Sequence, residues 1–340
     1  MRVQLIKKLY NHHGFRVLAF ESDFFGCTKI GERWSDGKAN LNDFRRQLYS
    51  FWGNTKETEE LFIWLDFLPR SARMSLCGFD CRHTHLKSDD YLKSSLRHGI
   101  GKIIGQAGLS SQNRNLFLTT LAELLDKEYR SKITPSAKKN LLNTLRILYG
   151  SRNRDDLWKQ ELKNLYGFAK NAWEKNENDC RQRDRQMANN LLWLMSSKFK
   201  NQKIIVWAHN YHIMKDYSEV STKNDNNNVG NLMGEILSRR LSKKIYSIGF
   251  SSYSGKYMPD ACFGNYKKRQ AVKRPSSKSL ESAIAVHNNL FALLPLREAL
   301  SERKFIASAL FHNHPQRVRW SRIYDAIFFI KKMKGLSRCK

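Results

Sequence analysis

Short apolar segments that alternate with longer helical segments constrain the fold of this chain more than any other feature. Each short segment is rich in β-branched or aromatic residues and is bounded by polar residues, the pattern of a strand buried on both faces. Strands that are separated by helices pair in parallel through crossovers. The sequence therefore predicts an α/β fold with a mainly parallel sheet core flanked by helices. The predicted strands are Arg16–Glu21, Met74–Asp80, Lys203–His209, Lys244–Phe250 and Tyr324–Ile330.

A helical segment interrupts this core between the second and third predicted strands. Leucines recur there at helical spacing, and no strand pattern is present. Pro135 cannot lie deep in a helix, so it marks a connection between two helices, and Ser131 or Thr134 is placed to cap the second. We expect an α/β core of residues 1–84 and 202–340, interrupted by an all-α helical bundle insertion at 85–201, whose last helix at 181–195 leads back to the core.

The charge of the chain limits the classes of partner. The 340 residues include 60 Lys and Arg against 31 Asp and Glu, which gives a formal net charge of +29. The 41% share of hydrophobic residues is enough to fill a core, and it excludes disorder as the main state. A basic surplus attracts nucleic acid and anionic membranes whatever the fold. Because the surplus is spread along the chain without a nucleic-acid motif, we expect nucleic acid to bind only through non-specific charge.

No segment indicates a membrane span or export. No apolar run approaches the roughly 18–20 residues that a membrane helix needs, and residues 1–15 are typical of an amphipathic helix rather than a signal peptide. The cysteines contain no C-x-x-C pair and fit reduced thiols better than a disulfide framework. We therefore expect a cytoplasmic protein with no membrane partner. The cysteines are Cys27, Cys77, Cys81, Cys180, Cys262 and Cys339.

Titratable residues follow three of the predicted strands at the points where they end. His209 and His212 lie at the end of the third strand, Glu21 and Asp23 at the end of the first, and Asp80 at the end of the second. In open parallel sheets, ligands bind beyond the carboxyl ends of the strands. A histidine trades protons near neutral pH, and a neighbouring carboxylate fixes its tautomer and stabilises the imidazolium. The pattern predicts an acid–base catalytic site at these strand ends.

Each of these residues also has a purely structural interpretation. A strand-end histidine can bond a loop carbonyl, and Asp80 can cap the next helix or accept from His83 or His85. Three strand ends that all carry titratable groups favour function over these separate roles. We expect no metal or cofactor, because His209 and His212 form an H-x-x-H pair off a strand with no further ligand set.

The helix expected at 181–195 carries a second group of polar residues. Its apolar face includes Met187 and Leu191, while Arg183 and Asp184 lie on other sides. The ordinary interpretation is an amphipathic helix with solvated charges. The alternative is that these charges belong to a site.

The order of several segments is distinctive. RDRQMANNLLWL followed by KIIVWAHNYHI resembles the erythromycin esterase family, whose members carry an Arg-Asp-x-x-Met-Ala-x-Asn helix and then a strand ending in His-Asn-x-His or His-Asp-x-His. GFRVLAFESD resembles that family's Gly-Phe-x-x-x-x-x-Glu-x-Asp strand, and EELFIWLDFLPRSARMSLCGFD its helix and Gly-x-Asp-type strand. Residues 233–250, 279–297 and 324–330 also fit. The resemblance spans most of the chain and implies an α/β core interrupted by a helical bundle.

The resemblance also implies an activity. The family hydrolyses the macrolactone ester of erythromycin and related macrolides, which inactivates the antibiotic, by water attack helped by histidine and glutamate without a covalent nucleophile. Glu21 matches the family's strand-end glutamate, and His209 and His212 match its paired histidines. Arg183 and Asp184 match its helix start, for which we expect a pocket-ordering or oxyanion-side role. The catalytic candidates are therefore Glu21, His209 and His212, and the substrate-binding candidates are Asp23, Asp80, Arg183 and Asp184.

One family motif has no counterpart in this sequence. Gly-Glu-x-x-His-Gly, at the end of a strand before the Gly-Phe segment, supplies the histidine usually taken as the general base. His12 and His13 do not replace it, because they are expected at a helix end beside Gly14, away from the strand exits. The resemblance thus implies either an N-terminally shortened chain or a divergent member that lacks the usual base. Loss of a positioned general base lowers a rate by about 100- to 10,000-fold, so we expect weak or no hydrolysis by the chain as written.

Two other functions stay open on the sequence. A polyanion-binding protein is suggested by the basic segment Lys267–Ser279 and by aromatic residues that suit base stacking, namely Tyr253, Tyr257, Phe263 and Tyr266. Hydrolysis of a non-macrolide ester would use the same pocket, because the helical insertion and the loops shape it. In both esterase interpretations the partner is a small-molecule ester.

Overall fold

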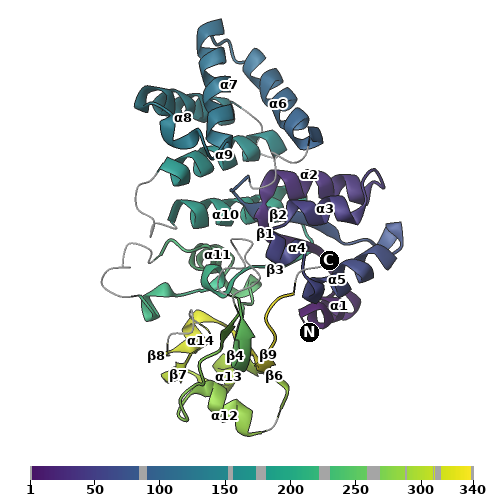
Figure 1. Ribbon diagram of the computed structural model, residues 1–340, viewed down its shortest axis with the longest axis vertical. Helices are drawn as coiled ribbons and strands as arrows, with labels where there is room; N and C mark the ends of the chain where they lie inside the picture. Colours follow the sequence, from purple (N-terminus) through teal and green to yellow (C-terminus); the bar gives the residue numbers. More distant parts are fainter. Residues whose placement is uncertain are drawn as a thin grey trace. The chain divides into compact units, whose positions relative to one another are not determined.

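The chain folds into two compact units of mixed α/β structure (Figure 1). The first unit contains Met1–Leu48 and Leu65–Trp207, and the second contains Tyr49–Trp64 and Ala208–Lys340. The described part of the first unit contains one three-stranded sheet, and that of the second contains a four-stranded sheet and a two-stranded one. The computed structural model describes residues 2–83, 90–151, 156–173, 181–221, 230–258, 269–287, 289–308, 310 and 315–337.

The first unit is built on a three-stranded parallel sheet. β1 (Phe15–Asp23) lies between β2 (Ser75–Asp80) and β3 (Lys203–Trp207). Every residue of β1 from position 17 onward is buried, which explains the unbroken apolar run in the sequence. Phe20 pairs with Gly78 on one side and with Trp207 on the other, so the three strands end at the same edge of the sheet.

Helices of the first unit pack against this sheet, and one of them approaches it very closely. A Cβ atom on Gly31 in α2 would lie 1.9 Å from the carbonyl oxygen of Leu76 in β2, so only glycine admits this packing. α1 ends at His13, beside Gly14 as predicted. The helices before β2 are α1 (Arg2–His13), α2 (Phe24–Ser35), α3 (Leu41–Gln47), α4 (Ser50–Gly53) and α5 (Lys56–Phe67), followed by the 3₁₀ turn η1 (Arg70–Ala72). Of these, α4 and most of α5 belong to the second unit.

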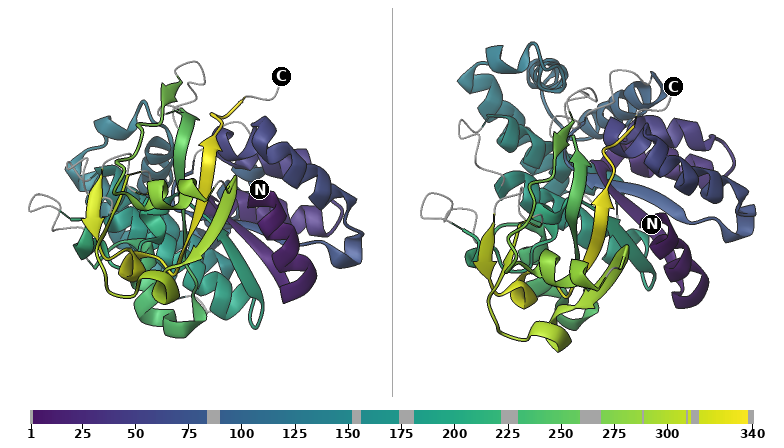
Figure 2. Two further views of the ribbon diagram at one scale, coloured as in Figure 1. Left: turned by 90° about the horizontal axis from the view of Figure 1, so that it is seen from below. Right: turned by 60° about the horizontal axis from the view of Figure 1, so that its bottom comes forward.

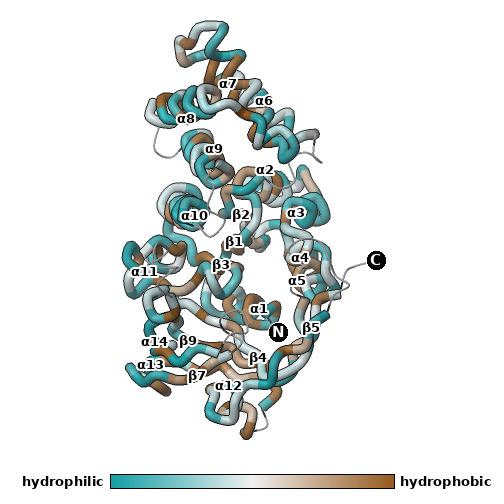
Figure 3. The backbone as a smooth tube through the Cα atoms, turned by 60° about the vertical axis from the view of Figure 1, so that its left-hand side comes forward, coloured by the Kyte–Doolittle hydropathy of each residue, from teal (hydrophilic) through white to brown (hydrophobic). Residues whose placement is uncertain are grey.

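The regular elements that the structure describes between β2 and β3 are all helices, and none of them is a strand. The side chain of Thr134 accepts from the backbone N–H of Ala137 at 3.3 Å, and Pro135 is the first residue of the helix, which confirms the helix start predicted there. The longer helices carry both hydrophilic and hydrophobic residues (Figure 3). The predicted domain boundaries at residues 84 and 201 stay a prediction. The helices are α6 (Asp90–Gly105), α7 (Ser111–Leu125), η3 (Arg130–Lys132), α8 (Pro135–Gly150), α9 (Leu157–Trp173), α10 (Arg181–Trp193) and the π-helical η4 (Leu194–Lys198).

The second unit contains a four-stranded mixed sheet. β4 (Ile248–Tyr257) and β9 (Ala326–Met333) are parallel, and they lie side by side as the green and yellow arrows of Figure 2. β5 (Gln270–Ala271) and β6 (Phe291–Pro295) pair antiparallel at its edges. The hydrophobic core of this unit is a cluster of buried side chains that includes Trp320 and, from β9, Ile327. The other elements are η5 (Asn210–Ile213), η6 (Tyr217–Glu219), α11 (Met233–Leu241), η8 (Ser242–Lys244), α12 (Leu280–Val286), α13 (Leu296–Leu300), β7 (Phe305–Ala307), β8 (Gln316–Val318) and α14 (Trp320–Ile323).

The mixed α/β class is confirmed, but the strand pairing differs from the single, mainly parallel core that the sequence suggested. All five predicted strands form strands. The first three pair with one another, whereas the last two, β4 and β9, join a separate sheet that includes the antiparallel strand β6. Local apolar patterning predicts that a segment is a strand, but the partner of a strand is selected by long-range packing.

The structure also bears on the predictions about thiols, membranes and polyanions. Three cysteines are free and buried: Cys27, Cys77 and Cys81. None of the helices in the described part of the chain combines the length and apolar character that a membrane crossing requires. Phe263, Tyr266 and Lys267, which carried part of the polyanion hypothesis, lie outside the described residues.

Candidate active site

The carboxylates at the ends of β1 and β2 form one buried cluster with Arg183. Nη2 of Arg183 donates to Oε1 of Glu21 and to Oδ2 of Asp80, both at 2.7 Å. Its Nε lies 3.2 Å from each carboxylate oxygen of Asp80. The three residues are 5%, 0% and 7% exposed for Glu21, Asp80 and Arg183. The structure thus brings together three residues predicted from separate parts of the sequence, and we call them the Arg183 cluster.

A β-bulge in β1 shapes the strand end that carries Glu21. Phe20 pairs with Gly78 and Asp23 pairs with Asp80, so β1 advances by three residues while β2 advances by two. A Cβ atom on Gly78 would lie 2.2 Å from the carbonyl oxygen of Asp23, and glycine is therefore required opposite the bulge. Bulges re-aim side chains and are common next to active sites. Both Glu21 and Asp23 are buried at this irregularity.

The location of Arg183 corrects one sequence interpretation. Arg183 and Asp184 lie in the first turn of α10 and are 7% and 0% exposed, so the solvated charged face expected for an ordinary amphipathic helix is wrong for both. A guanidinium has a planar fork of donors that suits more than one carboxylate oxygen. Buried charges are costly unless they are paired, and the guanidinium of Arg183 is the opposite charge next to both Glu21 and Asp80.

A second buried cluster surrounds His83. Nδ1 of His83 lies 3.5 Å from Oδ1 of Asp23, and Nε2 lies 3.3 Å from Oε1 of Glu161. The amide nitrogen of Asn164 is 3.4 Å from the same Nε2 and 3.3 Å from Oε2 of Glu161. Asp23 also caps α2, because its Oδ1 accepts from the backbone N–H of Gly26 at 3.1 Å. The side chains of His83, Asp23 and Glu161 are fully buried. We call Asp23, His83, Glu161 and Asn164 the His83 cluster.

The electrostatics of the His83 cluster favour retained protons. Burial lowers the pKa of His83, but the charges of Asp23 and Glu161 outweigh burial and raise it to about 9. Burial raises the pKa of Glu161 to about 8, although the charge of His83 acts in the opposite direction. The imidazole of His83 is fully buried, with one ring nitrogen facing Asp23 and the other facing Glu161, so neither nitrogen is directed at an open site. His83 therefore does not replace the histidine of the Gly-Glu-x-x-His-Gly motif.

The His83 cluster should make the fold less stable at alkaline pH. The pKa of Glu161 rises from 4.5 to about 8 and that of His83 from 6.5 to about 9, so the folded chain keeps protons that the unfolded chain releases. For each residue, the stabilisation is complete when the pH is below its pKa in the unfolded chain. It is lost as the pH rises through its pKa in the folded chain. We expect the free energy of unfolding in urea to fall between pH 5 and 9.

Glu161→Gln isolates the contribution of the carboxyl group, because glutamine resembles a protonated glutamate. The decline from pH 5 to 8 should be shallower in this variant, whereas replacing the exposed His287 with asparagine should leave the decline unchanged. A Glu161→Gln variant with the same pH slope as the original chain would contradict the raised pKa.

A network of amides fixes both clusters to their elements. The side-chain nitrogen of Asn190 donates to the carbonyl oxygen of Phe79 at 2.9 Å and to Oδ1 of Asn164 at 2.7 Å. Its oxygen accepts from Gln160 at 2.7 Å and from Gln186 at 2.8 Å. Helices α9 and α10 are therefore held to the end of β2 by buried polar bonds, which satisfy groups that would be costly to bury alone.

Sequence reasoning missed Glu161, although a signal was present. Glu161 lies four residues after Leu157 and four before Leu165, so it occupies the same helix face as these leucines. A carboxylate within an apolar helix face is rarely left buried without a partner. The sequence suggests His83 as a partner of Asp80, whereas the structure pairs it with Asp23 and Glu161.

The two predicted histidines belong to the second unit. β3 ends at Trp207, and His209 caps the following 3₁₀ turn, since its Nδ1 accepts from the backbone N–H of Tyr211 at 3.2 Å. In the neutral form the ring proton of His209 then lies on Nε2. His209 is exposed and His212 is buried, and their ring centroids are 6.5 Å apart. The structure brings these histidines together within the second unit, as it brings Glu21, Asp80 and Arg183 together within the first.

The turn that carries the histidines is firmly attached to β4. The side chain of Asn210 accepts from the backbone N–H of Phe250 at 3.0 Å and donates to its carbonyl oxygen at 2.8 Å. The buried hydroxyl of Tyr324 donates to the carbonyl oxygen of Asn210 at 3.2 Å. Within the described part of the chain, no three His, Cys, Asp or Glu side chains are grouped as metal ligands.

The fold and these residues define a mixed α/β protein with buried charged groups at the carboxyl end of a parallel sheet and a histidine pair after one of its strands. The model of the family described as Erythromycin esterase matches residues 10–333, and the chain belongs to that family.

Relatives with known names agree with this assignment. The protein named "Putative hydrolase YbfO" from Bacillus subtilis (strain 168) is 26% identical, in a match that covers 83% of this chain and 67% of YbfO. Erythromycin esterase type II from Escherichia coli is 23% identical, with coverage of 98% of this chain and 85% of the relative. These relatives support a hydrolase of the erythromycin esterase family.

Solved structures show the same fold at low identity. A succinoglycan biosynthesis protein has a TM-score of 0.71 at 19% identity and covers all of this chain and 85% of its own. A protein from Bacillus cereus has a TM-score of 0.73 at 16% identity, with coverage of 100% and 86%. An erythromycin esterase mutant in its open conformation has a TM-score of 0.65 at 15% identity, with coverage of 100% and 87%.

Proposed function

We propose that this chain hydrolyses a carboxylic ester by direct attack of water, with Glu21, His209 and His212 as its catalytic groups. The observation that carries the proposal is the buried salt bridge between Arg183 and Glu21 at a strand end. It pairs a carboxylate with a guanidinium at a place where the carboxyl ends of parallel strands commonly bind ligands. Membership of a family of hydrolases supports the reaction class.

The proposed reaction divides the proton transfers among these groups. Glu21 orients the water and accepts a proton as the water oxygen bonds to the ester carbonyl carbon. His209 and His212 donate to the carbonyl oxygen as it gains negative charge, and one of them gives a proton to the departing alkoxide. The products are a carboxylic acid and an alcohol. Arg183, next to Asp184 in α10, holds the carboxylate of Glu21 in position.

The proposed substrate is the macrolactone of a macrolide antibiotic. The Arg183 cluster has two carboxylates, Glu21 and Asp80, against one guanidinium, and Asp23 lies on the same strand end. This local excess of negative charge suits the dimethylamino cation of a macrolide. A non-macrolide ester is the second candidate, and one solved structure with this fold carries the name of succinoglycan biosynthesis, which favours an ester on a polysaccharide.

The test is incubation with erythromycin followed by mass spectrometry. Two forms of the protein are compared: the 340-residue chain and the same chain preceded by a segment that supplies Gly-Glu-x-x-His-Gly. We expect ring opening by addition of one water molecule, faster by about 100- to 10,000-fold in the extended form. Erythromycin left intact by both forms would refute the macrolide proposal, and a panel of simple esters would then test the second candidate.

A further inference from the structure

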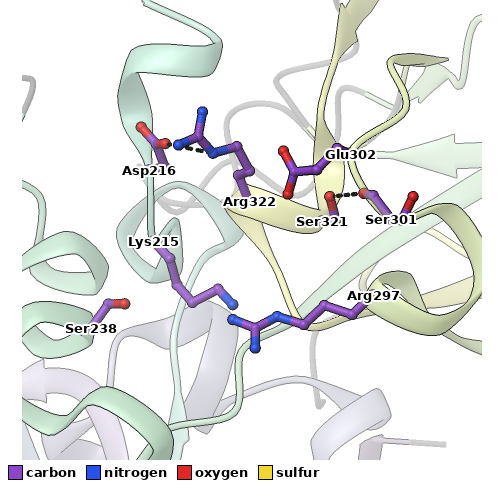
Figure 4. A pocket seen from close by; sticks show the side chains of 8 residues that line it. All are labelled: Lys215, Asp216, Ser238, Arg297, Ser301, Glu302, Ser321 and Arg322. Atoms are coloured by element: carbon purple, nitrogen blue, oxygen red, sulfur yellow. Dashed lines mark hydrogen bonds and ion pairs between the residues drawn. The ribbon is translucent and has the colours of Figure 1, made fainter.

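The second unit contains a charged cavity to which the proposed ester hydrolysis assigns no role (Figure 4). Its volume is about 480 Å³, and neither His209 nor His212 lines it. Three basic side chains, two acidic side chains and three serines form its walls, which come from the loop after η5, from α11 and α13, and from α14. The charged residues of the wall are Lys215, Arg297, Arg322, Asp216 and Glu302.

Two of these cations share a single carboxylate. Nζ of Lys215 lies 2.5 Å from Oδ1 of Asp325, and Nε of Arg297 lies 3.9 Å from the same oxygen. The other oxygen of Asp325 accepts from the backbone N–H of Ser247 at 2.8 Å. Figure 4 shows the ends of Lys215 and Arg297 next to each other. One carboxylate thus serves two adjacent cations, and the pair retains excess positive charge inside the cavity.

The other charged residues of the wall do not neutralise the excess positive charge next to Lys215 and Arg297. Arg322 forms ion pairs with two other carboxylates: its Nε lies 3.7 Å from Oδ2 of Asp216, and its Nη1 lies 3.3 Å from Oε1 of Glu219. Glu302 is at an exposed position, with its side chain 72% accessible, and its ionic contact is with Arg319. The side chain of Arg297 is 77% accessible, and Asp325 is its one ionic contact among the described residues. Arg297 therefore has donors available for a ligand.

We propose that this cavity binds a small phosphorylated metabolite, whose phosphate group is held between Lys215 and Arg297. A guanidinium fork, an ammonium group and serine hydroxyls are the donors that recognise phosphate oxygens in proteins. A volume of about 480 Å³ exceeds the size of a phosphate ion and falls within the range of small-molecule sites, so the serines and Asp216 can contact the rest of the ligand. The proposal does not depend on ester hydrolysis.

Isothermal titration calorimetry with inorganic phosphate and with glycerol 3-phosphate, at constant ionic strength in chloride, tests this assignment. Both probes should bind, and Arg297→Gln should weaken both about tenfold or more, because it removes charge-assisted hydrogen bonds. The control is Arg274→Gln, the same change at an exposed arginine that does not line the cavity, and it should bind like the original chain. Equal unfolding temperatures of the two variants would show that neither has lost its fold.

A second variant is expected to bind phosphate more tightly than the original chain. Glu302→Gln removes a negative charge from the cavity wall, so phosphate should bind roughly two- to threefold more tightly. Three results would overturn the proposal: no binding by the original chain, equal weakening by Arg297→Gln and Arg274→Gln, or binding of inorganic phosphate without binding of glycerol 3-phosphate.

Discussion

Replacing Arg183 with glutamine is expected to lower the free energy of unfolding by about 3–5 kcal/mol. Arg183 donates to both Glu21 and Asp80 within a region where all three residues are buried. Glutamine removes the positive charge and leaves two carboxylates buried without their cation. Urea unfolding at pH 7, followed by circular dichroism, measures the change.

Two further variants separate this charge effect from a general effect of mutation in α10. Arg185→Gln makes the same change two residues away at an exposed position, and it should alter stability by less than about 0.5 kcal/mol. Adding Asp80→Asn to Arg183→Gln removes one of the two orphaned charges and should recover part of the loss. A loss in Arg183→Gln no larger than in Arg185→Gln would contradict the assigned role of the Arg183 cluster.

Replacing Glu21 with glutamine is expected to reduce ester hydrolysis by about 100- to 10,000-fold in whichever form of the protein hydrolyses an ester. Glutamine still offers an oxygen to Nη2 of Arg183, so the hydrogen bond of the folded state is retained. What it loses is the ability to take a proton from water. Initial rates at saturating substrate, together with urea unfolding, measure the two consequences separately.

The comparison with Arg183→Gln makes this prediction specific. Glu21→Gln should lose activity with a much smaller loss of stability, whereas Arg183→Gln should lose both. Glu128→Gln, at an exposed position in the first unit, is the matched control and should retain full activity. Undiminished hydrolysis by Glu21→Gln would exclude Glu21 as the proton acceptor.

Much of the candidate site could be predicted because its chemistry lies at strand ends. The apolar run that forms β1 and the acids that follow it are adjacent in the sequence, so Glu21 and Asp23 were identified by position alone. The same reasoning located Asp80 at the end of β2 and His209 after β3. The roles assigned to these residues in catalysis stay a prediction.

The His83 cluster could not be predicted in the same way. Glu161 lies in the middle of a helix, where polar residues ordinarily face solvent, and its partner His83 follows a strand in a distant part of the sequence. Only a comparison of its position with the neighbouring leucines indicated burial. The sequence also does not predict that the strands divide among separate sheets, because the edge at which a strand pairs depends on the packing of the whole unit.

The sequence by itself determined the mixed α/β class, the strands and the titratable groups at their ends, because patterns of burial and helix capping act over a few neighbouring residues. The tertiary structure decided which charges meet. Arg183 lies 162 residues from Glu21 and 103 from Asp80, yet it bonds to both. Such pairs form because a buried charge must find an opposite charge or a donor, and only the folded arrangement of β1, β2 and α10 places one within reach.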